Sequence, residues 1–287
     1  MLDVDSPRGA YGFRLIYPEA DAGEHLADLI ELDTLAPAVT VTWRLASTIR
    51  DIEEIQAARV VYGRRGASTF YVERQPLSIH FDLPAPVVPG AFVHPLLTLG
   101  ISVHARWRGD VTLHAGAFET PNGGWGIMGA RQAGKSALLA ALAERGCPIV
   151  ADDLLAVLDG SAWAGPSCVD LRPDAAGRFA SSYFLGMVGG RPRHRLSTPP
   201  GRVQVPLRGF FVLDWHDRLA IEAEPLQAAE RLQWLYRQEY ISLVGWPEPE
   251  KLLPIAVLPA WRMTRPRDWA ATQEVVDRVL EVACGAG

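Results

Sequence analysis

The feature that most constrains this chain is the glycine-containing stretch at residues 129–136. It matches the pattern G-x-x-x-x-G-K-[ST], in which glycines let backbone N–H groups turn toward phosphate, the lysine supplies positive charge and the hydroxyl reaches Mg²⁺. Residues 125–128 before it predict a short buried strand, and the leucines at 138, 139 and 142 after it predict a helix whose N-terminus faces the phosphates. The predicted nucleotide-binding residues of this loop are Gly129, Ala130, Arg131, Gln132, Ala133, Gly134, Lys135 and Ser136.

The lysine content of the chain supports this interpretation. Lys135 and Lys251 are the two lysines of the sequence, and one of them stands where the pattern requires a lysine. An arginine would fit poorly there, because a planar fork does not replace a compact ammonium group in a tight loop. The alternative is a chance match in a chain rich in alanine and glycine.

Two adjacent carboxylates follow the predicted helix. Residues 148–153 read Pro-Ile-Val-Ala-Asp-Asp, a short apolar run that predicts a strand ending in Asp152 and Asp153. Since the carboxyl ends of neighbouring strands in an α/β sheet share one crevice, both acids are expected to face the loop. One acid would bind Mg²⁺ and the other would accept the proton of an attacking hydroxyl. The simpler alternative is that the pair caps the following turn.

These residues resemble the HPr kinase/phosphorylase family of P-loop kinases. Asp152 lies 17 residues after Lys135, and residues 150–153 resemble the strand that follows the phosphate loop in that family. His114 lies 15 residues before Gly129, where the family has a histidine beside its active site. The resemblance implies ATP and Mg²⁺ as cofactors, Asp152 as the general base, Asp153 paired with His114 at the metal and phosphate end, and Lys135 among the catalytic residues. Taken alone, a histidine at a strand end is more often structural.

A weaker resemblance continues toward the C-terminus. In residues 168–174, Asp170 would help to hold the metal and Arg172 would contact phosphate or substrate; the alternative is an ordinary strand and turn with solvated charges. Residues 191–195 form a basic cluster suited to nucleotide phosphates or an acidic peptide, in which Arg193 and Arg195 are the predicted contacts, although a bare charge run is usually a solvated loop. The implied metal ligands are Ser136, Asp153 and Asp170.

The chain also departs from the bacterial HPr kinase pattern. Arg131 and Gln132 replace a small residue and a glycine, and Ala137 replaces a glutamate. These differences argue against HPr as the substrate and leave nucleotide binding intact.

The N-terminal part predicts a separate β-rich region. Residues 11–15, 68–72 and 78–81 alternate apolar residues as strands do, and the proline-rich segment 84–89 predicts a linker. A β-rich lead-in followed by an apolar helix at 96–107 resembles the stand-alone HPr-kinase-like proteins, some of which phosphorylate a serine of ribosomally made precursor peptides, including lasso peptides. The expected fold is α/β, an HPr-kinase-like (PEP-carboxykinase-like) P-loop core with a mixed sheet. Its predicted divisions are residues 1–88 and 89–287.

The remaining patterns complete this core. Residues 203–214 and 219–224 predict two strands of a hairpin, 261–264 predict one more strand, and 225–243 and 269–283 predict helices. The first of these helices and residues 246–249 would wall a peptide groove, although aromatic residues in such a helix are more often core residues.

Composition narrows the class of protein. With 48% apolar and 21% charged residues the chain suits an ordinary soluble protein, and the net charge of −5 argues against a nucleic-acid partner. Three cysteines without metal-ligand spacing favour reduced thiols in a cytoplasmic protein, and the first residues lack a secretory signal pattern. Prolines and histidines interrupt the apolar stretch at 84–105, so no membrane partner is expected. The oligomeric state, a homo-oligomer included, is left open.

The sequence therefore predicts an ATP-dependent serine kinase acting on a small peptide or protein. Two other classes remain open. One is a non-catalytic nucleotide-binding regulator, and the other is an ATP hydrolase or a kinase acting on a small molecule or HPr-like protein. The identity of the acceptor, the donor nucleotide and any reverse phosphorolysis are not encoded in these patterns.

Overall fold

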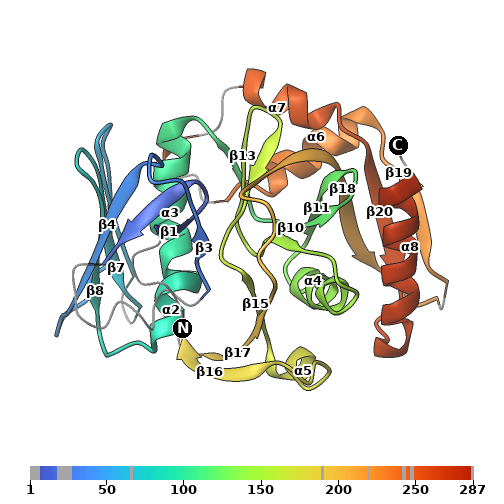
Figure 1. The fold of residues 1–287 in the computed structure, drawn as a ribbon, viewed down its shortest axis with the longest axis horizontal. Coiled ribbons are helices and arrows are strands. Elements are labelled where there is room, and N and C mark those ends of the chain that lie inside the picture. Colours follow the sequence, from blue (N-terminus) through green and yellow to red (C-terminus); the bar gives the residue numbers. More distant parts are fainter. Residues whose placement is uncertain are drawn as a thin grey trace.

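The computed structural model describes residues 7–17, 28–64, 67–188, 191–218, 220–240, 244–245 and 249–285. In this part of the chain the protein is a mixed α/β structure with three sheets, two of them large (Figure 1). Among the described residues, no helix combines the length and the apolar character needed to cross a membrane.

The first sheet contains the N-terminal strands in the order β3-β1-β2-β4-β8-β7-β6-β5. Strands β2, β4 and β8 run parallel to one another, and the other neighbours are antiparallel. The predicted β-rich character of this region is present. Its strands are β1 (Arg8–Ala10), β2 (Phe13–Ile16), β3 (Ile30–Glu31), β4 (Ala38–Leu45), β5 (Ile52–Ile55), β6 (Arg59–Gly63), β7 (Thr69–Arg74) and β8 (Leu77–Leu83).

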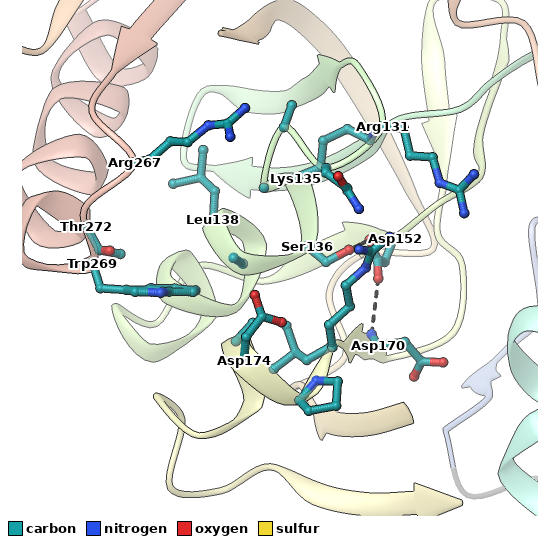
Figure 2. A pocket seen from close by; sticks show the side chains of 18 of the residues that line it. Arg131, Lys135, Ser136, Leu138, Asp152, Asp170, Asp174, Arg267, Trp269 and Thr272 are labelled. Carbon is teal, nitrogen blue, oxygen red and sulfur yellow. Dashed lines mark hydrogen bonds between the residues drawn. The ribbon is translucent and has the colours of Figure 1, made fainter. Parts of the chain in front are cut away.

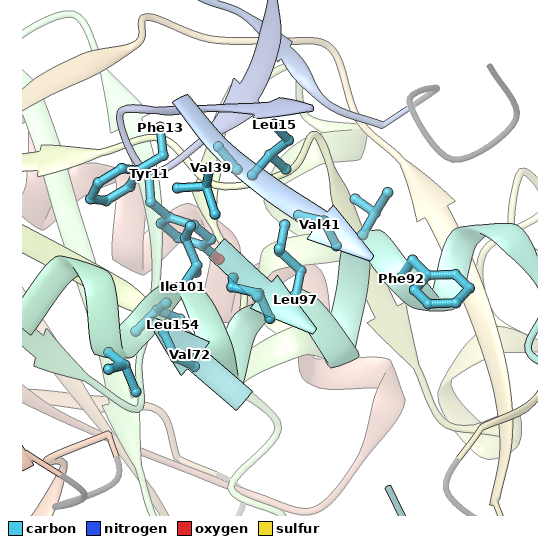
Figure 3. Close-up of a cluster of buried hydrophobic side chains, with 14 of the residues drawn as sticks. Tyr11, Phe13, Leu15, Val39, Val41, Val72, Phe92, Leu97, Ile101 and Leu154 are labelled. Carbon is cyan, nitrogen blue, oxygen red and sulfur yellow. The ribbon is translucent and has the colours of Figure 1, made fainter. Parts of the chain in front are cut away.

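One long helix covers this sheet. After the irregular segment 84–88 come α2 (Pro89–Ala91), a kinked segment (Phe92–Leu96) in which His94 is extended, and α3 (Leu97–Arg108), close to the predicted helix at 96–107. Leu97 and Ile101 share a core with Val39 and Val41 of β4, and Leu154, which directly precedes β13 of the second sheet, belongs to the same core (Figure 3). The predicted division at residue 88 thus falls between the sheet and the helix that covers it.

The second sheet builds the centre of the molecule, in the order β12-β10-β11-β18-β14-β13-β9 with β20 beside β18 and β19 beside β20. Strand β11 is parallel to β18, and β18 is parallel to β20. Strand β12 is antiparallel to β10, which is antiparallel to β11, so β12 runs in the direction of β11. The strands are β9 (Val111–Leu113), β10 (Gly116–Thr120), β11 (Gly123–Gly129), β12 (Ile149–Ala151), β13 (Leu155–Leu158), β14 (Ser161–Trp163), β18 (Gln204–Trp215), β19 (Glu222–Pro225) and β20 (Ala260–Arg265).

This arrangement brings four chain segments to one edge of the sheet. The carboxyl ends of β11, β18 and β20 are Gly129, Trp215 and Arg265, and β12 ends there just before Asp152. Ligands of open α/β sheets bind outside the carboxyl ends of the strands. The edge therefore places the glycine-containing loop, the acidic pair and two residues of the C-terminal half beside one another.

Helices and a small third sheet enclose this edge. Helices α4 (Lys135–Glu144) and α8 (Thr272–Gly285) pack together through an apolar core that includes Leu139, Val276 and Val279. The small sheet has the order β15-β17-β16 and lies below the central sheet in Figure 1. The remaining elements are β15 (Cys168–Leu171), α5 (Pro173–Ala176), β16 (Tyr183–Val188), β17 (Arg191–Ser197), α6 (Ala228–Arg237), α7 (Pro249–Ala256) and a 3₁₀ turn (Trp269–Ala271).

The predicted hairpin at 203–224 is wrong. Strands β18 and β19 exist, but β20 lies between them, parallel to β18 and antiparallel to β19. Parallel pairing with β20 places β18 in the sheet interior, where it is buried from Gly209 to Leu213. The predicted helix at 225–243 is shorter, since α6 ends at Arg237, and Leu219, residues 241–243 and residues 246–248 of the predicted peptide groove lie outside the described residues.

The packing of α3 on the first sheet predicts a stability effect. Leu97→Ala removes a fully buried side chain and should lower the free energy of unfolding by about 2–5 kcal/mol. The matched control is Leu35→Ala, because Leu35 is 88% exposed, and its free energy should change by less than about 0.5 kcal/mol. Urea unfolding followed by circular dichroism measures both. Equal effects would contradict the assigned packing.

Candidate active site

The loop between β11 and α4 is a tight turn held by its own residues. Gly129 and Gly134 have φ angles of 153° and 83°, and Gln132 has a φ of 69°, in the left-handed region that favours glycine. A Cβ at position 134 would lie 3.0 Å from Arg265 Nη2, so a larger residue would crowd that side chain. The Lys135 ammonium donates to the Gly129 carbonyl at 3.0 Å, across the mouth of the loop. Burial lowers the pKa of Lys135, and the charges of Asp153 and Asp152 oppose that shift.

Asp152 is the buried member of the acidic pair. Its Oδ1 accepts from Ser136 Oγ at 2.9 Å, and its Oδ2 accepts from the Asp170 backbone N–H at 3.1 Å. The residue is 5% exposed. Burial raises the pKa of Asp152, and the negative charges of Asp153 and Asp170 add to the increase. These contacts hold Asp152 against the first turn of α4.

Asp153 is the accessible member and contacts His114. The two atoms His114 Nδ1 and Asp153 Oδ1 lie 3.0 Å apart, and the two side chains are 40% and 33% exposed. Asp153 has a φ of 72°, an uncommon backbone state for a residue other than glycine. Burial acts to raise the pKa of Asp153, but the hydrogen bond with His114 and the positive charges around it outweigh burial and lower this pKa to about 2. The carboxylate is therefore ionised across the physiological range.

Asp170 contacts two arginines from β17. Arg195 Nε donates to Asp170 Oδ1 at 2.8 Å and Arg195 Nη2 to Asp170 Oδ2 at 3.2 Å, while Arg193 Nη1 lies 3.5 Å from Oδ2. His94 Nε2 is 3.9 Å from the same oxygen. The Asp170 carboxylate is thus already neutralised by protein groups.

The guanidinium of Arg195 is fully buried. Besides Asp170, it donates to Asp28 Oδ2 at 2.9 Å and to the carbonyls of Gly90 and His94 at 2.8 Å each. Arg195 does not line the cleft described next. The structure differs here from the prediction that Arg195 contacts a nucleotide phosphate, because the group has no accessible surface and its donors are taken by the protein.

A cleft of about 880 Å³ opens over the loop and the acidic pair (Figure 2). Gly129, Ala130 and Arg195 are predicted site residues that do not line it. The predicted residues that do line it are His114, Arg131, Gln132, Ala133, Gly134, Lys135, Ser136, Asp152, Asp153, Asp170, Arg172 and Arg193. The predicted site residues between positions 114 and 193 that line the cleft therefore surround a single cavity.

Sequence reasoning missed a second set of lining residues, mainly from the C-terminal half. They include His94, Asp174, Trp215, Arg265, Arg267, Trp269 and Thr272. Arg191, from the basic cluster predicted at residues 191–195, lines the cleft as well. Trp215 and Arg265 end strands parallel to β11, so the rule that ligands bind at strand carboxyl ends would have found them had the strand order been known. Arg265 Cζ lies 3.9 Å from the centroid of the Trp215 ring, and burial lowers the pKa of Arg265 to about 10.

The donor atoms at this edge suit a hard cation. Mg²⁺ prefers oxygen ligands, and the Ser136 hydroxyl and the Asp152 and Asp153 carboxylates lie together at the start of α4. Asp170 is less available because Arg195 occupies both of its oxygens. Among the described residues, no cluster of three or more histidine, cysteine or acidic side chains forms a ready-made metal site.

Known proteins show only a distant similarity to this chain. No family model matches the chain, and no curated protein matches it. One solved structure with similarity is the Hpr(Ser) kinase/phosphatase from Coxiella burnetii, with 13% sequence identity and a TM-score of 0.31 over 61% of this chain and 97% of that chain. A similarity this low identifies neither the family nor the activity of the chain.

The enclosed position of Arg195 predicts a large loss of stability on its removal. Arg195→Met leaves the Asp28 and Asp170 carboxylates, each 8% exposed, without their main partner. Breaking a buried ion pair in this way should lower the free energy of unfolding by about 3–5 kcal/mol. Arg191→Met on the same strand is the matched control, because Arg191 is exposed and pairs with no described residue, and it should change stability by less than about 0.5 kcal/mol. Urea unfolding of both variants tests this, and a mild effect at position 195 would refute it.

Proposed function

We propose that the protein is a kinase that transfers the γ-phosphoryl group of ATP to a hydroxyl group. The observation that carries this proposal is the contact of Ser136 with Asp152 directly beside the Gly129–Ser136 loop, with Asp153 and His114 at the same sheet edge. A phosphate-binding turn alone suits any nucleotide-binding protein. A buried carboxylate and a second, ionised carboxylate beside it add what phosphoryl transfer needs, which is positioning, metal binding and a proton acceptor.

In this proposal the loop holds the phosphates. Backbone N–H groups of the loop bind the phosphate oxygens, other than that of Ala133, which donates to the Ala130 carbonyl, and the Lys135 ammonium turns from the Gly129 carbonyl to the phosphates. Ser136 and Asp153 would hold Mg²⁺, which would supply positive charge to neutralise the phosphates. Asp153 suits this task because its low pKa keeps it ionised, and His114 fixes its orientation at 3.0 Å.

Asp152 is the proposed proton acceptor. Its raised pKa makes it a stronger base than Asp153, and a general base is most effective when its pKa approaches the working pH. Both of its oxygens are held by Ser136 and the Asp170 N–H, so the carboxylate is fixed in place before the acceptor arrives.

The proposed acceptor is a serine of a small peptide or protein. Arg172 and Arg191 are exposed, line the cleft and have no side-chain partner among the described residues, and Arg193 beside them pairs with Asp170. An acidic segment next to the accepting serine fits this exposed positive charge. A ribosomally made precursor peptide, as in lasso peptide modification, is the acceptor to test first. The protein is proposed to act in the cytoplasm, with residues 89–287 as the kinase core and residues 1–88 as a β-rich region that precedes it.

Asp152→Asn should slow phosphoryl transfer by orders of magnitude while the protein stays folded. Losing a general base costs about 10²–10⁴-fold in rate, and Asn keeps the shape of the side chain. Labelled ATP·Mg²⁺ with candidate acceptor peptides, read by mass spectrometry, measures the transfer. Lys135→Ala should also be inactive, and Glu144→Gln at the far end of α4 is the control that should keep full activity. Full transfer by Asp152→Asn would remove Asp152 from the role of base.

The same assay separates the rival functions. A nucleotide-binding regulator would bind ATP and yield no phosphorylated product. An ATP hydrolase or a small-molecule kinase would consume ATP and leave every peptide unmodified. Either result with the wild-type protein would replace the proposed function.

The raised pKa of Asp152 predicts the acid side of the pH profile. The base works only when deprotonated, so kcat/KM should fall as the pH drops through the Asp152 pKa, with a midpoint above the ordinary aspartate value of about 3.9. Steady-state rates over a pH series, with circular dichroism to confirm folding, measure this midpoint. A midpoint at or below the ordinary value would contradict the assignment.

A further inference from the structure

The cleft extends beyond the loop to a wall that the C-terminal segment builds. This wall contains Trp269 from the 3₁₀ turn, Thr272 and Val275 from α8, and Leu138 from the first turns of α4. In Figure 2, Lys135 and Ser136 lie between Asp152 on one side and Trp269 on the other. The proton acceptor and Trp269 therefore stand at opposite ends of the cleft.

The wall is formed largely by apolar side chains, with Asp268 of the same turn also lining the cleft, and it is held in place. Leu138 and Val275 are 4% and 3% exposed and belong to the core between α4 and α8. Arg178, which does not line the cleft, supports the Trp269 ring with its Cζ 5.6 Å from the ring centroid. The Asp268 side chain accepts from the Ala270 backbone N–H at 2.9 Å and fixes the turn that carries Trp269. An anchored indole beside aliphatic side chains is a surface for a flat aromatic group.

The position of this wall relative to the phosphate loop indicates which flat aromatic group would reach it. Phosphates held by residues 130–136 lead outward along the start of α4, past Ala137 and Leu138, both of which line the cleft. Because the γ-phosphoryl group must lie at Asp152, the opposite end of a nucleoside triphosphate points toward Trp269. Arg267 from the same segment also lines the cleft, with its Cζ 5.6 Å from the centroid of the Trp215 ring (Figure 2).

We propose that Trp269, with Leu138, Thr272 and Val275, forms the subsite for the nucleobase of the phosphoryl donor. This inference rests on the proposed function. The base stacks on the Trp269 indole, Leu138 and Val275 contact its edge, and the Thr272 hydroxyl offers an uncharged hydrogen-bonding group on the same wall. An apolar side chain of the acceptor peptide is the competing occupant, and the experiment below separates the two.

The test compares ATP with inorganic tripolyphosphate, which has the phosphates and lacks the base. Isothermal titration in the presence of Mg²⁺ measures both affinities for the full-length protein. Trp269→Ala should weaken ATP binding about 5- to 100-fold, the effect of losing one base–aromatic stack, and leave tripolyphosphate binding unchanged. Trp269→Phe should retain most of the ATP affinity and shows whether an aromatic ring suffices.

A matched control is available on α6. Trp234 is half-buried, has an arginine Cζ 5.6 Å from its ring centroid as Trp269 does, and does not line this cleft. Trp234→Ala should therefore leave both affinities unchanged. Circular dichroism verifies that each variant is folded.

The outcomes separate the subsite from the proposed function. If Trp269→Ala binds ATP as tightly as the wild type, or loses ATP and tripolyphosphate equally, the subsite is overturned while nucleotide binding stands. Wild-type binding of ATP no tighter than tripolyphosphate also overturns the subsite. If the wild type binds neither ligand, the proposed function itself fails and the subsite fails with it. A peptide occupant would show as lost peptide binding with unchanged ATP affinity.

Discussion

The ion-pair network around Arg195 joins the parts of the molecule on which the candidate site depends. One fully buried guanidinium contacts Asp28 ahead of β3, two carbonyls of the segment at 90–94, and Asp170 on β15. Placing such a charge in the interior costs several kcal/mol, and the cost is offset only when every donor has a partner. Here all five N–H donors of the guanidinium have a partner, and the backbone N–H of the same Asp170 holds Asp152. The position of the buried acid therefore depends on contacts made far from it in the sequence.

The direction of the strands in the central sheet provides the second constraint. Because β11, β12, β18 and β20 run the same way, the loop, the acidic pair, Trp215 and Arg265 meet at one edge. Arg265 donates to the Ala133 carbonyl and lies over the Trp215 ring, and Trp215 donates to the Gln132 carbonyl at 3.3 Å. The loop is thus supported from its side by the ends of the neighbouring strands, which limits how far it can relax when empty.

The sequence predicted those features whose cause is local. The loop with its flanking strand and helix, α3, α8 and the β-rich N-terminal region all follow from glycine placement or apolar periodicity. The pairing of β20 between β18 and β19 could not be predicted, because strand order depends on contacts between distant segments. Arg195 shows the same limit. Arg191, Arg193 and Arg195 are spaced two residues apart on β17. Only the Arg195 side chain is fully buried, because Asp28 and the segment at 90–94 contact it. A charge run in the sequence does not reveal which member will be buried.

The backbone at Asp153 explains how two consecutive acids line one cleft. In a regular strand, neighbouring side chains point to opposite faces, so an acidic pair would present one carboxylate to the cleft and turn the other away. The left-handed conformation of Asp153, with a φ of 72°, interrupts that alternation immediately after β12. Aspartate is among the few residues other than glycine that adopt this state readily, at a cost of about 1–2 kcal/mol. An aspartate at position 153 therefore meets two requirements. It supplies a carboxylate to the cleft, and its backbone tolerates the left-handed conformation that exposes that carboxylate.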